Sequence, residues 1–292
     1  LIELHPKGDV VLVVSGSVSG LERRFLVHSE LLTIVSPYFA ALFGPVFREG
    51  RETKQGTSLQ AQLKEDDTEA MEIILSLLHF KTKDEYKNIE PRLLALVARE
   101  SNKYGCTTAL WHWIFRWLHD TPEPLNAEEH GCLLVATYLF GATDHWKAIS
   151  TRAIKQLAPG FRTSWSGQEV LSLLPQHIEV GRCYEEQIFL TLDLLHIEIQ
   201  KIEGVLQSDT AAYKQDSLLC CDCGRLLPCG AGQCRPCRNK NPHATFCTAQ
   251  TRVAEYFNIL RRNELWPSVA PFGNQTITRI SNQLSRLCVF NH

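Results

Sequence analysis

The chain has 292 residues and a mass of 33.1 kDa, with 44% hydrophobic and 21% charged side chains. These proportions exclude a wholly disordered or collagen-like chain, and the length suits two or three domains that each bury a core. Thirty basic and thirty-two acidic residues give a formal net charge of −2, which excludes a global field for nucleic acid or anionic membrane. No apolar stretch reaches the ~20 residues of a membrane span, and the first residues lack a signal-peptide pattern. We therefore expect an intracellular protein, in the nucleus or cytoplasm, without a membrane partner.

The first forty residues predict a small sheet followed by paired helices. Residues 8–15 form a β-branched run, and a glycine-bearing turn separates them from a second short strand at residues 24–28. Ser29 is the expected N-cap of the next helix, and Ser36, followed by proline, is the expected N-cap of the helix after it. His28 lies at the strand-to-helix corner, where we expect its imidazole to bond with the backbone.

Strand and helix patterns continue to residue 118. Residues 58–63 alternate as a half-exposed strand does, and Asp66 with Glu69 has the spacing of a capping box before an apolar helix. Two more helices are expected at residues 93–104 and 107–118. The second of them carries three tryptophans, which are expected to pack in the interior.

These elements carry a series of short motifs. In chain order they are Gly8-Asp9-Val10, Val27-His28-Ser29-Glu30-Leu31-Leu32, Ser36-Pro37-Tyr38-Phe39, Glu65-Asp66-Asp67 and Asn102-Lys103-Tyr104. Together they strongly resemble the landmarks of a BTB/POZ domain over residues 6–118. The resemblance implies an α+β domain, a small sheet with helical hairpins, that binds proteins and does no chemistry. We therefore expect an adaptor or scaffold, not an enzyme, with protein partners and no small-molecule substrate.

The resemblance also implies a particular partner. In BTB adaptors of cullin-based ubiquitin ligases, a hydrophobic-x-acid motif follows the helix that matches residues 36–43. The matching residues here are Phe47 and Glu49, an aromatic anchor beside a charged rim. We expect them to contact a cullin, although an ordinary loop explains three residues equally well.

The sequence predicts a domain boundary at Thr121-Pro122-Glu123-Pro124, so residues 1–120 are expected to fold alone. The region beyond is predicted to be all-α and resembles the companion region of fungal BTB proteins; its expected helices are 127–140, 143–157, 167–174 and 185–207. Polar residues 208–219 are expected to be a connection. The predicted division is a BTB/POZ domain at 6–120, a helical extension at 121–207, a cysteine-rich zinc module at 208–262 and a C-terminal tail at 263–292, with a short helix at 253–260.

Seven of the eleven cysteines lie within residues 220–247, which indicates metal binding in a reducing compartment. Zn²⁺ prefers four soft ligands at tetrahedral corners, and two Cys-x-x-Cys turns can supply them. The predicted ligands of one structural zinc ion, in a ribbon-like site, are Cys220, Cys223, Cys234 and Cys237. The remaining cysteines are expected to be ordinary buried thiols; they are Cys106, Cys132, Cys183 and Cys288.

Several alternatives stay open at the cysteine cluster. The spare donors are Cys221, Cys229, His243 and Cys247. With Cys234 and Cys237, the last two would form a knuckle of retroviral type; a compressed two-zinc RING-like site and metal-free thiols are further alternatives. Residues 220–262 also carry seven basic and two acidic side chains. The alternative function is therefore a nuclear or transcriptional regulator whose zinc module contacts nucleic acid, although a solvated basic face explains the charge more simply.

Overall fold

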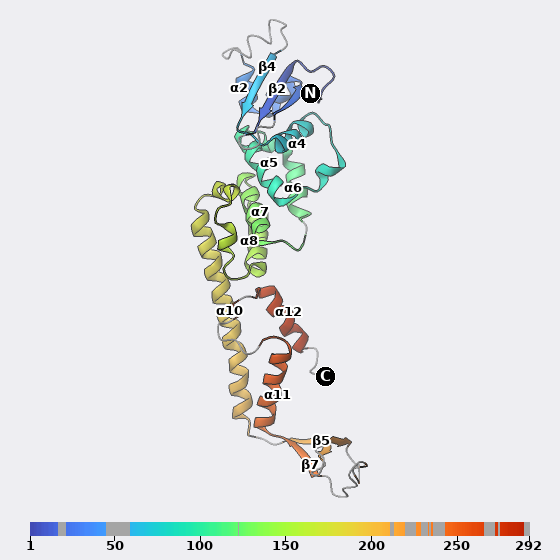
Figure 1. The fold of residues 1–292 in the computed structure, drawn as a ribbon, viewed down its shortest axis with the longest axis vertical. Helices are drawn as coiled ribbons and strands as arrows, with labels where there is room; N and C mark the ends of the chain where they lie inside the picture. Colours follow the sequence, from blue (N-terminus) through green and yellow to red (C-terminus); the bar gives the residue numbers. More distant parts are fainter. Residues whose placement is uncertain are drawn as a thin grey trace. The chain divides into compact units, whose positions relative to one another are not determined.

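The computed structural model describes residues 1–16, 22–44, 59–121, 123–210, 213–219, 226–228, 233, 235, 243–265, 272–273 and 275–288. The chain divides into two compact units, Leu1–Glu185 and Glu186–His292. Figure 1 labels their main helices and strands. Both units combine helices with a small β-sheet, and this confirms the expected α+β class at a coarse level.

Strand β2 lies at the centre of the sheet of the first unit. The strands are β1 (Ile2–Glu3), β2 (Val10–Ser15), β3 (Glu22–Val27) and β4 (Leu59–Lys64), in the order β1-β3-β2-β4. β3 runs antiparallel to β2, and β4 runs parallel to it on the other side. Four of the six β2 residues are buried, and a strand covered on both faces needs such a continuous apolar run. The predicted strands at 8–15, 24–28 and 58–63 are confirmed within a few residues.

A pair of short helices, α1 (Ser29–Val35) and α2 (Pro37–Leu42), follows β3. The predicted N-cap of α2 is confirmed, because Ser36 Oγ accepts a hydrogen bond from Phe39 N at 3.1 Å. The predicted N-cap of α1 is wrong. His28 occupies that position, and the Ser29 hydroxyl instead donates to Asp9 Oδ2 at 2.6 Å, which ties the helix to the residue before β2.

The next segments are α4 (Thr68–Leu78), η1 (Asp84–Lys87), α5 (Pro91–Lys103), η2 (Thr107–Leu110) and α6 (Trp111–His119). α4 packs against α5. The tryptophans of α6 do not all lie inside. Trp117 is buried and donates from its indole nitrogen to Tyr86 O at 2.7 Å, whereas Trp111 is 46% exposed.

The first unit continues through α7 (Ala127–Leu139), α8 (Thr143–Gln156), α9 (Arg162–Trp165) and η3 (Glu169–Leu173). α7 begins with the capping box of Asn126 and Glu129, and its middle turns are buried. This helix packs against α5, so the helices on the two sides of the predicted boundary belong to one compact unit. The domain division at residue 120 stays a prediction.

Helix α10 (His177–Ser208) begins earlier than the predicted start at Glu185. Beyond it lie β5 (Tyr213–Leu219), β6 (Leu226–Pro228), β7 (His243–Cys247), α11 (Ala249–Arg262) and α12 (Ile277–Cys288). The prediction that residues 208–219 are only a connection is wrong, because β5 pairs antiparallel with both β6 and β7. Among the described residues, no helix is long and apolar enough to cross a bilayer.

Two of the four scattered cysteines fit the expectation of buried thiols. Cys106 and Cys132 are buried, and burial raises the pKa of each thiol to about 12. Cys183 on α10 is exposed, so the prediction is wrong there. The side chain of Cys288 lies outside the described residues.

Candidate interaction surface and its buried carboxyl pair

The residues predicted to act as sites lie outside the described residues. They are Phe47 and Glu49 for partner binding, the expected zinc ligands Cys220, Cys223, Cys234 and Cys237, and the spare donors Cys221 and Cys229. His243 and Cys247 stand at the two ends of β7, for which the backbone alone is described. The roles of these residues in partner binding and zinc binding are therefore proposals.

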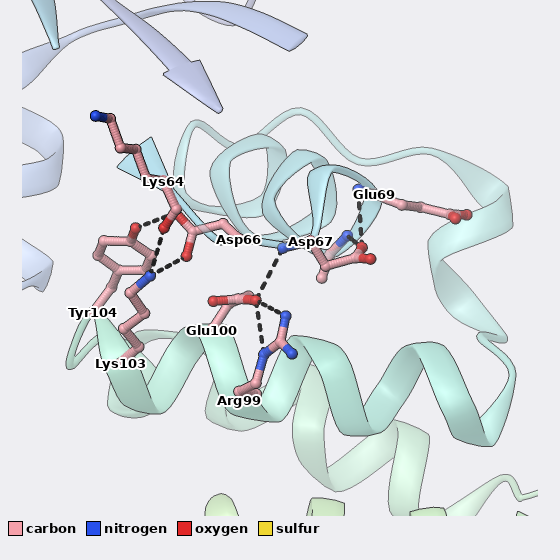
Figure 2. A network of polar contacts seen from close by, with 9 residues as sticks. Lys64, Asp66, Asp67, Glu69, Arg99, Glu100, Lys103 and Tyr104 are labelled. Carbon is pink, nitrogen blue, oxygen red and sulfur yellow. Dashed lines mark hydrogen bonds and ion pairs between the residues drawn. The ribbon is translucent and has the colours of Figure 1, made fainter. Parts of the chain in front are cut away.

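A network of polar side chains joins the end of β4 to the end of α5 (Figure 2). Asp66 is only 1% exposed, and its Oδ2 accepts a hydrogen bond from the Tyr104 hydroxyl at 2.5 Å. Lys103 forms an ion pair with Oδ1 of the same carboxylate and also donates to Lys64 O at 3.2 Å. Burial, followed by the bond to Asp66, raises the pKa of Tyr104. Asp66 thus fixes the C-terminal turn of α5 against the strand.

Glu100 is a second buried carboxyl group in this network. The residue is 0% exposed, and its Oε1 accepts from Asp67 N at 3.0 Å and from the Arg99 guanidinium at 3.0 and 2.5 Å. Its Oε2 has no hydrogen-bond partner within the described part of the chain. Burial is the largest effect on Glu100, and it raises the pKa of the carboxyl group. The Asp67 N–H and the Arg99 guanidinium lower this pKa, whereas Asp66 raises it. Glu100 is therefore a buried acid whose pKa lies above its ordinary value.

The network also explains why the predicted capping box is wrong. Asp67, not Asp66, is the N-cap of α4, and its Oδ1 accepts the N–H groups of Glu69 and Ala70 at 3.1 and 2.9 Å. Asp66 is one residue too early to cap and points to the opposite side, toward α5 (Figure 2). The two adjacent aspartates therefore have different roles at this strand-to-helix junction: Asp67 caps α4, and Asp66 accepts the hydrogen bond from Tyr104. The motifs Glu65-Asp66-Asp67 and Asn102-Lys103-Tyr104 meet in this network, and Glu100 is the member that sequence reasoning missed.

A surface groove, here called the α5 groove, runs along the side of α5 next to this network. Its larger part has a volume of about 690 Å³ and is enclosed by α4, η1 and α5. A second part of about 350 Å³ continues toward η3 and shares Asp67, Arg92 and Leu96 with the first. The two parts therefore adjoin at these three residues, within the first unit.

The α5 groove combines an apolar floor with an acidic rim. Ile89, Leu93 and Leu96 are half-buried and line the larger part. The carboxyl groups that line the same part belong to Asp67, Glu69, Glu72, Glu85 and Glu90, against the two cations of Arg23 and Arg92. Such a surface suits a partner that offers both apolar side chains and positive charge.

Glu72 is a rim carboxylate that two cationic side chains hold. It forms ion pairs with Arg23 and with Lys83, the latter at 2.7 Å. Burial opposes ionisation, but the hydrogen bond from Lys83 and the charges of Lys83 and Arg23 outweigh it and lower the pKa of Glu72. This carboxylate belongs to the wall of the groove and is not free for a partner.

The histidine corner at the end of β3 differs from the prediction. The His28 backbone N–H donates to His79 Nε2 at 3.1 Å, whereas His28 Nδ1 has no partner among the described residues. Because Nε2 of His79 accepts, its Nδ1 carries the proton and donates to Leu75 O at 2.7 Å. Burial, and then nearby charge, lowers the pKa of His79. The corner is held by a neutral His79, and the imidazole that bonds to the backbone is not that of His28.

Comparisons with known proteins identify no relative of this chain. No protein-family model matches it, and no curated protein matches its sequence. The BTB/POZ resemblance stays a prediction.

Proposed function

We propose that the chain is a protein-interaction adaptor. The observation that carries the proposal is an exposed apolar surface on the α1–α2 helix pair. Ile34 is 79% exposed, and Tyr38 is 42% exposed although its ring packs edge-on against Tyr104 at 4.9 Å between centroids. Exposed large apolar side chains on an ordered helix pair favour contact with another protein. This surface directly precedes, in sequence, the segment 45–58 that carries Phe47 and Glu49.

The order of elements supports the BTB/POZ resemblance on which the adaptor proposal also rests. The motifs predicted a strand, a hairpin, a second strand and then paired helices. The described chain has β2, β3, α1 and α2 in that order, and Ser36 caps the second helix as the motif implies. The buried network supplies a physical reason for two further landmarks, since Asp66 and Tyr104 bond to each other.

Within this proposal, the partner is a cullin-type ligase scaffold bound through Phe47 and Glu49. An aromatic ring that enters an apolar pocket contributes most of the binding energy of a small hot spot, and a hydrated rim charge contributes less. Truncation of such an anchor costs about 2–4 kcal/mol, or roughly 30- to 1,000-fold in affinity. Phe47→Ala should therefore nearly abolish binding, and Glu49→Ala should weaken it to a smaller extent.

The test is a calorimetric titration of the full chain with a cullin N-terminal domain. Phe80→Ala is the matched control, because Phe80 is 84% exposed at the end of α4 and lies away from the motif in sequence. The proposal predicts saturable binding that Phe47→Ala removes and Phe80→Ala leaves intact. Absence of wild-type binding at tens of micromolar, or equal losses in the two variants, would overturn the cullin assignment.

We also propose that the cysteine-rich segment is a zinc-stabilised module of this adaptor. Leu219, at the end of β5, pairs with Leu226 at the start of β6 and with His243 at the start of β7. The backbone positions of Leu219, Leu226 and His243 therefore lie at one end of the β6-β5-β7 sheet. In the sequence, Cys220 and Cys223 follow Leu219, and Cys234 and Cys237 precede His243. This backbone arrangement suits a site in which two Cys-x-x-Cys turns hold one ion.

Elemental analysis of reduced protein tests the zinc proposal. We predict one equivalent of zinc in the wild type and its loss in Cys234→Ser, with unfolding of the local sheet because metal binding and folding are coupled there. Cys183→Ser is the control, since this free, exposed thiol lies outside the cluster. Protein without zinc, or zinc retained in Cys234→Ser, would contradict the proposed ligand set.

A further inference from the structure

The rim of the α5 groove carries an excess of negative charge, because five carboxyl groups line its larger part against the two cations of Arg23 and Arg92. Glu69 and Glu90 line the groove, and neither side chain has an ion-pair partner within the described part of the chain. Among the described residues, the ion-pair partner of Glu85 is Lys83, at 3.4 Å, and the Glu85 side chain is 69% exposed. Figure 2 shows the Glu69 carboxylate pointing away from the buried network. Three carboxylates on α4, η1 and the start of α5 therefore surround one hollow.

The floor between these carboxylates is apolar and only partly covered. Leu93 and Leu96 lie three residues apart on α5, which places them on the same helix face, and Ile89 joins them from the preceding turn. All three are half-buried. A ligand with charge alone would leave this floor in water, and an apolar ligand alone would desolvate the rim carboxylates without a partner.

The shape of the groove selects among ligands that carry both features. The larger part, about 690 Å³, continues into the second part of about 350 Å³ along α5. The second part is lined by the Arg99 side chain and by residues of η3. Two adjoining, open hollows suit a segment of polypeptide that crosses both better than a compact small molecule that fills one.

We propose that the α5 groove binds an extended peptide of a partner protein that carries arginine or lysine on both sides of aliphatic side chains. The aliphatic residues lie over Leu93 and Leu96, and the cationic residues pair with Glu69, Glu85 and Glu90. This inference deepens the proposed adaptor function, on which it rests, by naming the chemistry of the protein that the adaptor recruits. The cullin would be bound elsewhere, through Phe47.

The probe is a fluorescein-labelled ten-residue peptide with Leu-x-x-Leu flanked on each side by two arginines. Its matched partner has glutamates in place of the arginines. Fluorescence anisotropy with the full chain should show saturable binding of the arginine peptide that weakens as salt rises, and no binding of the glutamate peptide. An arginine peptide that does not saturate, or equal binding of the two peptides, would overturn the proposal.

Variants locate the site. Glu69→Gln combined with Glu90→Gln should raise the dissociation constant of the arginine peptide roughly 3- to 10-fold, because partly hydrated ion pairs contribute modestly. Glu30→Gln is the matched control, since this exposed carboxylate lies on α1 outside the groove. Leu93→Ser should weaken binding independently of salt, with a thermal melt to verify folding. Equal effects of Glu30→Gln and the double variant would refute the assignment to this groove. The cullin titration uses a different ligand and different variants, so either idea can fail without the other.

Discussion

The buried carboxyl pair should make the stability of the chain depend on pH in a way that one conservative variant removes. Glu100 is 0% exposed, and burial raises its pKa above the ordinary value of 4.5. In the unfolded chain the carboxyl group ionises near that ordinary value. Below it, both states hold the proton and the full stability is present. As the pH rises from there through the raised pKa, the unfolded state loses its proton first, so stability falls.

The magnitude follows from one proton. Within this window the free energy of unfolding should fall by about 1.4 kcal/mol for each pH unit, and it should level off once folded Glu100 also ionises. Glu100→Gln keeps a side-chain oxygen that can accept from Asp67 N, but it has no proton to lose. Glu100→Ala leaves the buried Asp67 N–H without an acceptor and should cost about 1–3 kcal/mol at every pH.

The assay is urea unfolding of the full chain between pH 4.5 and 9, with the exposed Glu30→Gln as control. All other titrations are common to wild type and variant, so their difference in free energy of unfolding reports Glu100 alone. We expect Glu100→Gln to gain stability relative to wild type as the pH rises through the window, and Glu30→Gln to follow the wild type. A constant difference across the whole range would refute the raised pKa of Glu100.

Two further predictions follow from packing in the first unit. His130 is buried, and its burial, followed by the charge of Arg152, lowers its pKa from 6.5 to about 4, so the free energy of unfolding should decrease as the pH falls between these values. In thermal melts, His130→Leu should flatten this decrease, whereas His119→Leu, at an exposed position, should not. Parallel curves for His130→Leu and the wild type would contradict the prediction. Because α5 packs against α7, we expect residues 1–185 to unfold in one cooperative transition. The same circular dichroism melts test the predicted independent folding of residues 1–120, and a 1–120 fragment that aggregates or shows no transition would contradict the predicted boundary.

Local patterns in the sequence predicted the first unit well where a single segment decides the structure. The β-branched run at 8–15 and the Ser36 cap need no distant partner, and both are confirmed. The roles of Asp66 and Glu100 depend on residues more than thirty positions apart in the chain, so nothing local shows that these acids point inward. Glu100 looks like any charged residue on an amphipathic helix.

The second unit was predicted less well, for two different reasons. β5 is polar along part of its length, and its pairing with β6 and β7 outweighs a composition typical of a connection. α12 lies inside the predicted C-terminal tail, although its apolar residues Ile277, Ile280 and Leu284 recur at helical spacing. The predicted zinc ligands lie outside the described part of the chain. For this region, only the register of the neighbouring strands can be compared with the prediction.

The central claim is that one chain joins two partners, and sedimentation velocity tests it most directly. The sample contains the full chain, a cullin N-terminal domain and the labelled arginine peptide, and absorbance of the label reports where the peptide travels. We expect the peptide to sediment with the cullin domain only when the chain is present. Phe47→Ala should remove the cullin domain from this complex, while the peptide stays bound to the chain. A peptide that displaces the cullin domain, or a chain that carries neither, would contradict the adaptor function.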